Sequence, residues 1–161
     1  MNVALMIGRG GSTGFPGKNL FKLLGRPLMD YPLLAAKNAR VDRLFLSTDD
    51  EAIARNGAAQ GCELITRPPE LATKEALSED AFRHGYREIV KRLGAEPRYV
   101  VLLFANGATI APVLMDAGFD FLDKNPDFDS AASVSLYNMF SPLRARKIID
   151  GQVQPFIPPA F

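Results

Sequence analysis

The chain has 161 residues, 47% of them hydrophobic and 23% charged, which is typical of one globular domain. Its 19 basic and 18 acidic side chains leave a formal net charge of +1, which argues against non-specific DNA binding and against a polybasic membrane protein. The single Cys62 excludes an intramolecular disulfide, and with His84 alone it cannot form a structural zinc site. The apolar start is too short to span a bilayer and lacks a secretory signal. We therefore expect a soluble cytoplasmic protein without nucleic-acid or membrane partners.

Short apolar runs alternate with longer stretches of helical periodicity. Residues 3–7 form a continuous apolar run that predicts a strand buried on both faces, and a glycine-rich loop follows over 8–18. An Asp-Gly pair predicts a tight hairpin over 147–153. The remaining predicted strands cover 44–47, 63–65, 99–104 and 130–136. The predicted helices cover 28–39, 78–93 and 112–124, and another follows residues 48–51 and ends near Gly57 or Gly61.

Some positions predict where the helices begin and which side chains they bury. Thr48 stands three residues before Glu51, a capping-box signature, and Ser78 is suited to cap the longest helix. Two consecutive prolines in 67–73 predict a rigid loop without regular structure. The predicted buried stripes consist of Leu28, Tyr31, Leu34, Ala35 and Ala39 in one helix and of Phe82, Tyr86, Ile89, Val90 and Leu93 in another.

Repeated strand-then-helix units predict an α/β fold of three layers, α/β/α, with a mainly parallel open sheet. The chain shows no internal repeat and no linker, so we expect a single domain over residues 1–161. In such sheets, ligands bind beyond the carboxyl ends of the strands. The loops over 8–18, 67–78 and 105–109 are therefore the candidates for a binding site.

The loop over 8–18 contains five glycines and two cations, Arg9 and Lys18, directly after a buried strand. Glycines allow backbone N–H groups to approach a polyanion, while Arg and Lys neutralise its charge. A flexible surface loop is the alternative. The loop lacks the P-loop pattern, because Ser12 and Asn19 stand where that motif needs Gly and Ser or Thr. It also lacks the dinucleotide pattern, because Thr13 occupies the place of the third glycine.

Three segments in order resemble the acylneuraminate cytidylyltransferase family, whose enzymes activate sialic acid and related acidic sugars. The first is the glycine-rich loop, and the next two are residues 47–50 (Ser-Thr-Asp-Asp) and 67–72 (Arg-Pro-Pro-Glu-Leu-Ala). Ser78 falls where the family has a serine close to the cytosine. The loop residues that match in register are Arg9, Gly11, Ser12, Gly14, Lys18 and Asn19.

The resemblance implies a nucleotide-diphospho-sugar transferase-like fold and a cytidylyltransferase reaction. The sugar's anomeric hydroxyl would attack the α-phosphate of CTP with the help of Mg²⁺, and pyrophosphate would leave. Arg9 and Lys18 would be the catalytic residues, because they would stabilise the charge that builds on the phosphates. Arg67 and Ser78 would contact the cytosine or its surroundings. The triphosphate would be held by Arg9, Lys18, Ser12, Asn19 and the amides of Gly10 and Gly11.

The sequence departs from the family's pattern in the fourth segment and at the C-terminal end. Phe104 stands where the family has a glutamine that faces the sugar, and Asn106 or Thr109 is a candidate for the polar contact in its place. Thr13 replaces a family lysine. Family members usually continue into a strand and a late pair of metal-binding aspartates, so we expect the C-terminal part of the family fold to be missing. The resemblance also implies a homodimer.

Several candidate residues also have ordinary structural interpretations. Asp49 and Asp50 are possible Mg²⁺ ligands, with helix capping as the alternative. Arg67 either binds a ligand or forms a salt bridge with Glu63 or Glu70. We expect His84 to be structural and Cys62 to be a small core residue. For the whole chain, the alternatives are a nucleotidyltransferase with another nucleotide or acceptor and a non-catalytic nucleotide-binding remnant.

Overall fold

The computed structural model describes residues 1–134 and 145–157, and its chain divides into one unit over 1–131 and another over 132–161. The first unit is built on four parallel strands in the order β5-β4-β1-β6. These strands are β1 (Asn2–Ile7), β4 (Arg43–Thr48), β5 (Glu63–Thr66) and β6 (Tyr99–Phe104). The predicted parallel α/β sheet is confirmed.

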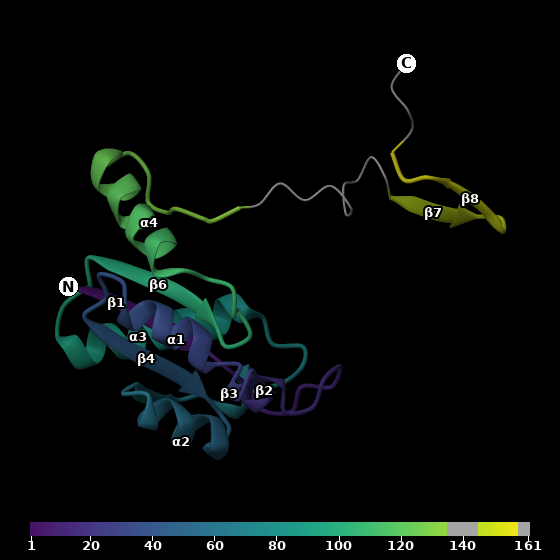
Figure 1. Ribbon diagram of the computed structural model, residues 1–161. Coiled ribbons are helices and arrows are strands. Elements are labelled where there is room, and N and C mark those ends of the chain that lie inside the picture. Colours follow the sequence, from purple (N-terminus) through teal and green to yellow (C-terminus); the bar gives the residue numbers. More distant parts are fainter. Residues whose placement is uncertain (135–144, 158–161) are drawn as a thin grey trace. The chain divides into compact units, whose positions relative to one another are not determined.

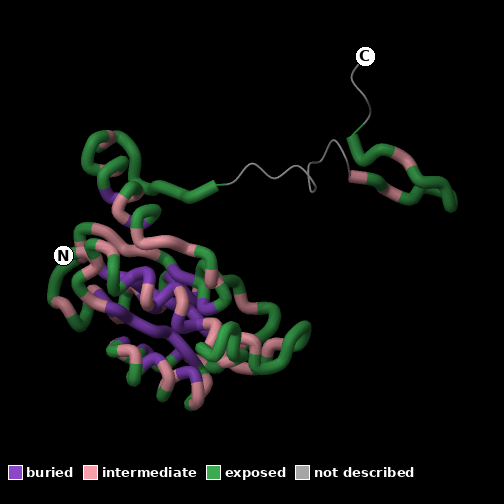
Figure 2. Tube along the Cα trace, viewed as in Figure 1, coloured by how far each residue is buried: buried purple, intermediate pink, exposed green. Residues whose placement is uncertain are grey.

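In the described part of the chain, helices pack against the sheet, as Figure 1 shows. They are α1 (Asp30–Lys37), α2 (Glu51–Ala59), α3 (Ser78–Leu93) and α4 (Pro112–Lys124). One core cluster joins side chains of α1, α2 and α4 to one face of the sheet, with Met6, Leu46 and Leu103 at its centre. A second cluster joins α3 to the opposite face. The predicted three-layer arrangement is therefore confirmed, and Figure 2 shows the buried residues concentrated in the sheet and on the inner helix faces.

Short elements complete the first unit. Single 3₁₀ turns cover Lys18–Leu20 (η1) and Pro69–Leu71 (η2), and a small antiparallel hairpin pairs β2 (Lys22–Leu23) with β3 (Arg26–Pro27). The expectation of no regular structure over 67–73 is thus wrong, because Pro69 occupies the first position of η2, where its missing N–H costs nothing.

The helix starts differ from the sequence expectations. Asp50, not Thr48, caps α2: Asp50 Oδ1 accepts from the Ile53 N–H at 2.9 Å. Thr48 is instead the buried last residue of β4, and its hydroxyl accepts from the Asp50 N–H. In α3, Ser78 is already the first helical residue, and no side chain caps the helix at Leu77.

Two buried faces also differ from the prediction. In α1, Leu33, Ala35 and Ala36 are buried while Leu34 is only half-buried, and Leu28 lies outside the helix, which begins at Asp30. In α3, the buried residues are Ala81, Phe82, Gly85 and Ile89, while Tyr86, Val90 and Leu93 are half-buried.

The strand β6 is less buried than its sequence predicts. It pairs only with β1 among the described residues and lies at the edge of the sheet, with Leu102 52% and Phe104 49% exposed. The strand predicted over 130–136 is absent from 130–134, and residues 135–136 lie outside the described residues.

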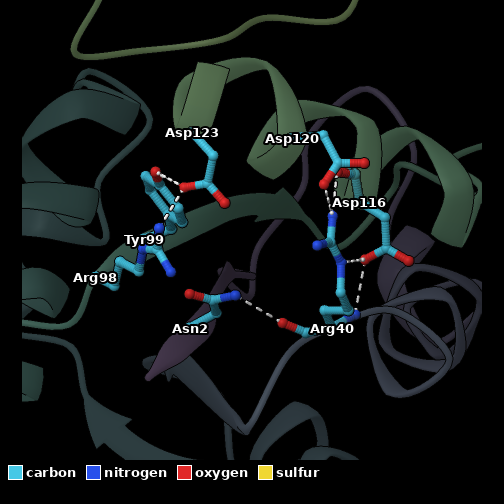
Figure 3. A network of polar contacts seen from close by, with 7 residues as sticks. All are labelled: Asn2, Arg40, Arg98, Tyr99, Asp116, Asp120 and Asp123. Atoms are coloured by element: carbon cyan, nitrogen blue, oxygen red, sulfur yellow. Dashed lines mark hydrogen bonds and ion pairs between the residues drawn. The ribbon is translucent and has the colours of Figure 1, made fainter. Parts of the chain in front are cut away.

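A polar network fixes α4 at the amino ends of the strands (Figure 3). Arg40, which precedes β4, donates to Asp120 at 2.6 Å and pairs with Asp116. At the start of β6, Arg98 and Tyr99 both donate to Asp123. These exposed contacts contribute modestly to stability, but they hold α4 at the end of the sheet opposite the loops that follow the strands.

The second unit contains one described hairpin, formed by β7 (Arg146–Ile149) and β8 (Gln152–Pro155). Asp150 and Gly151 form its turn, with φ angles of 52° and 76°. A two-residue hairpin loop commonly requires such left-handed conformations at both positions. The hairpin predicted from the Asp-Gly pair is confirmed. No helix among the described residues has both the length and the apolar character needed to cross a bilayer.

Candidate functional site

A cleft of about 440 Å³ opens at the carboxyl ends of β1 and β6, where Ile7 and Phe104 line it. The three loops that the sequence marked as binding candidates all contribute to it, as parallel strands dictate. From the glycine-rich loop come Gly8, Arg9, Ser12, Thr13, Gly14, Phe15, Lys18 and Asn19. From the other two loops and α3 come Arg67, Leu71, Ala76, Leu77, Ser78, Ala81, Ala105 and Asn106.

The glycine-rich loop leaves β1 beside the end of β4, because the Gly8 N–H donates to the Ser47 carbonyl at 3.1 Å. The backbone of Arg9 is fixed by a hydrogen bond: buried Asn19 donates from Nδ2 to the Arg9 carbonyl at 3.1 Å. The Arg9 guanidinium also reaches the Ala72 carbonyl at 3.4 Å, in the second candidate loop. These contacts place the first cation of the loop at the cleft.

Three cations line the cleft, Arg9, Lys18 and Arg67, and no acidic residue does so among the described residues. Arg67 is 5% exposed and donates to the carbonyl and hydroxyl of Ser47. Burial lowers the pKa of the Arg67 guanidinium, while the charge of Asp49 raises it and that of Arg9 lowers it further. A concave, cationic surface of this kind favours a polyanionic ligand.

The cleft also has apolar lining, which the sequence analysis did not assign. Phe15, Leu77 and Phe104 line it and are 48%, 62% and 49% exposed. The Phe104 ring packs edge-to-face against Phe82, with ring centroids 5.4 Å apart. Exposed aromatic and aliphatic side chains beside cations can hold the flat face of a nucleobase. Phe15 and Leu77 lie in otherwise polar loops, which was the only sequence signal for them, whereas Phe104 ends the apolar strand β6.

The structure brings together most of the residues that the sequence selected. Arg9, Lys18, Ser12, Asn19, Arg67, Ser78 and Asn106 all line the cleft. Gly10, Gly11 and Thr109 do not: the Gly10 N–H donates to Asp49, and Gly11 lies exposed with φ 63°. The ligand contacts assigned to these residues remain predictions.

The aspartates considered as metal ligands lie beside a second hollow of about 520 Å³, together with Thr48, Glu51 and Arg67. Asp49 accepts from the Gly10 N–H, and Asp50 caps α2. Within the described ranges, no three His, Cys, Asp or Glu residues lie close enough to hold a metal ion. Asp49 and Asp50 do not line the cleft, and their assignment as Mg²⁺ ligands remains a prediction.

Three of the structural alternatives can be assessed directly. Cys62 is buried in the core, and burial raises the pKa of its thiol to about 12, as expected of a core residue. His84 is half-buried, and its Nδ1 has no hydrogen-bond partner among the described residues. Arg67 forms no salt bridge within the part of the chain that the structure describes; Glu63 pairs instead with Arg43.

The chain is similar in sequence to known cytidylyltransferases. The family model described as Cytidylyltransferase matches residues 3–98. N-acylneuraminate cytidylyltransferase A of Danio rerio is 37% identical over 86 residues, which cover 53% of this chain and 20% of that protein. The 3-deoxy-manno-octulosonate cytidylyltransferase of Anaeromyxobacter dehalogenans (strain 2CP-C) is 34% identical over 118 residues, covering 72% of this chain and 45% of the relative.

The fold is also similar to that of solved cytidylyltransferases. A structure of CMP:2-keto-3-deoxy-manno-octonic acid synthetase complexed with CTP superposes with a TM-score of 0.63 at 20% identity, covering 78% of this chain and 48% of that one. The chain thus spans less than half the length of these relatives. The match over residues 3–98, more than half of the chain, shows that it belongs to the cytidylyltransferase family that includes the N-acylneuraminate and 3-deoxy-manno-octulosonate enzymes.

Proposed function

We propose that the chain binds CTP and transfers its cytidylyl group to the anomeric hydroxyl of an acidic keto-sugar, sialic acid-like or related. The observation that carries the proposal is the charge of the cleft: Arg9, Lys18 and Arg67 line it, and no acidic residue does so among the described residues. Family membership supplies the nucleotide and the reaction class. The identity of the sugar is left open between the two substrate classes that the relatives' names carry.

In the proposed reaction, a new bond forms between the anomeric oxygen and the α-phosphorus. The bond between the α-phosphorus and the bridging oxygen breaks, pyrophosphate leaves, and the hydroxyl proton passes to solvent. Lys18 and Arg9 neutralise the charge that develops on the phosphates, which is the main requirement of this chemistry. The mostly buried Arg67 adds a fixed positive charge beneath the same cleft. Leu77, next to Ser78, provides apolar surface for the base.

The proposal is tested by measuring pyrophosphate release. The full chain is incubated with each of the four nucleoside triphosphates and with a panel of keto-acid sugars in the presence of Mg²⁺. Release with CTP and an acidic keto-sugar supports the proposal, and release with a different nucleotide or acceptor favours another nucleotidyltransferase of the same fold.

A second candidate function, nucleotide binding without turnover, is supported by the position of Phe104. Phe104 places an aromatic ring in the cleft where the resemblance implies a sugar-facing glutamine. CTP binding without pyrophosphate release with any acceptor supports this candidate, and no affinity for CTP excludes both.

The resemblance also implies Mg²⁺, a homodimer and a cytoplasmic location, and we keep all three as parts of the proposal. Titrating Mg²⁺ during pyrophosphate release tests the metal. Sedimentation equilibrium of the full chain tests the dimer, and fractionation of cells that produce it tests the location.

A further inference from the structure

The glycine-rich loop is tied to the end of β4 by one side chain outside the cleft. The Gly10 N–H donates to Asp49 Oδ1 at 3.0 Å, across 39 positions of sequence. Of the backbone N–H groups from Arg9 to Gly17, all within the described residues, only this one donates a hydrogen bond within the chain. Among these N–H groups, Gly10 is therefore the point at which the loop is held, and the Arg9 carbonyl beside it accepts from Asn19.

The contact lies next to Arg9, whose side chain lines the cleft. Asn19 holds the Arg9 carbonyl on one side of the peptide group, and Asp49 holds the following N–H on the other. Gly10 and Gly11 lack side chains that restrict the backbone, so without an external partner this segment would sample many conformations. Fixing a binding loop before its ligand arrives lowers the entropic cost of binding.

The carboxylates that follow Asp49 in the sequence, Asp50 and Glu51, do not accept from the Gly10 N–H. Asp50 uses its Oδ1 to cap α2. The Glu51 side chain is 92% exposed and pairs with Arg55. Asp49 itself does not line the cleft but the second hollow, and its carboxylate contacts the glycine-rich loop.

We propose that Asp49 is a positioning residue of the polyphosphate site, because its carboxylate holds the Gly10 N–H and so directs Arg9 toward the cleft. The proposal rests on the proposed function, since it assumes that the cleft takes a nucleoside triphosphate. It assigns Asp49 the role of a hydrogen-bond acceptor and needs no metal ion.

Three variants of the full chain separate the possible roles of Asp49. Asp49→Ala removes the acceptor and the charge, and Asp49→Asn removes the charge but keeps an acceptor oxygen. Glu51→Ala is the matched control, because it removes a nearby negative charge without touching the loop. The first readout is the amide exchange rate of Gly10 by NMR without ligand, and the second is calorimetric titration with CTP, inorganic tripolyphosphate and cytidine.

We expect Asp49→Ala to speed Gly10 exchange at least about tenfold, because the N–H loses its partner. It should weaken CTP and tripolyphosphate binding by about tenfold, the worth of one hydrogen bond, and leave cytidine binding unchanged. Asp49→Asn should recover most of the slow Gly10 exchange and most of the affinity for CTP and tripolyphosphate. Glu51→Ala should match the wild type.

Unchanged Gly10 exchange in Asp49→Ala overturns the inference, and so does an Asp49→Asn variant as impaired as the alanine variant. Thermal unfolding of each variant shows whether the fold is intact, and Asp49→Asn decides the question if the alanine variant does not fold. A wild-type chain that binds neither CTP nor tripolyphosphate contradicts the proposed function, while Gly10 exchange still decides whether Asp49 holds the loop.

Discussion

Removing the Lys18 side chain tests whether the positive charge of the cleft binds phosphate. Lys18 is half-buried at the start of η1, lines the cleft, and has no carboxylate partner among the described residues. Lys18→Ala therefore breaks no ion pair of the free protein. Its backbone N–H, which donates to the Phe15 carbonyl at 3.2 Å, is retained, so η1 should persist.

The expected effect follows from one charge-assisted hydrogen bond to phosphate. Such bonds contribute about 1.5–3 kcal/mol, which corresponds to roughly a tenfold to hundredfold change in Kd. Lys18 is only partly buried, so solvent screening favours the lower end, about tenfold.

The assay is calorimetric titration of the full chain with CTP at constant ionic strength, repeated with tripolyphosphate. Lys22→Ala is the matched control, since Lys22 is exposed on β2 and does not line the cleft. Both ligands should lose affinity for Lys18→Ala, while Lys22→Ala should bind like the wild type. Equal affinity of Lys18→Ala and the wild type refutes the assignment of the phosphate site.

Three further predictions concern the scaffold. Removing the cap of α2 with Asp50→Ala should lower the free energy of unfolding by about 1 kcal/mol in a urea titration. Gly85→Ala should destabilise the fold by about 1–2 kcal/mol, because its new methyl would lie 2.7 Å from Cδ2 of fully buried Leu5; a variant as stable as the wild type would contradict the packing described for α3. The Cys62 thiol, whose pKa is raised to about 12, should resist iodoacetamide at pH 8 until the chain unfolds. Because the folded pKa lies above the unfolded one, its contribution to stability is complete below pH 8 and declines as the pH rises toward 12, which urea titrations across that range would detect.

The sheet was the most predictable part of the structure. Apolar runs identified β1, β4 and β6, because strands buried between helices are apolar along their length, and the shorter segment over 63–65 identified β5. The same rule failed to predict the exposure of Leu102 and Phe104, since sequence does not tell whether a strand lies at the centre or the edge of a sheet.

The first residues of the helices were less predictable than the strands. Both Thr48 and Asp50 are suitable capping residues, and the choice depends on where β4 stops. Thr48 still belongs to β4 and pairs with Thr66 of β5, so the cap falls to Asp50. Ser78 illustrates the same limit, because α3 starts one residue earlier than a Ser78 cap requires.

The site was predicted as a set of loops, and the structure joins those loops in one cleft. Glycine content and charge identified Arg9 and Lys18, but they did not indicate that the Gly10 amide bonds to Asp49. That contact joins residues 39 positions apart, and local sequence patterns carry no information about it. Phe15 and Leu77 were missed because single apolar residues in loops are common on protein surfaces.

A crystal structure of the full chain with CTP tests the central claim most directly. The account predicts phosphate oxygens within hydrogen-bond distance of Lys18 Nζ and of the Arg9 guanidinium, with the base against Leu77. A triphosphate bound outside this cleft, with Lys18 directed into solvent, would contradict it.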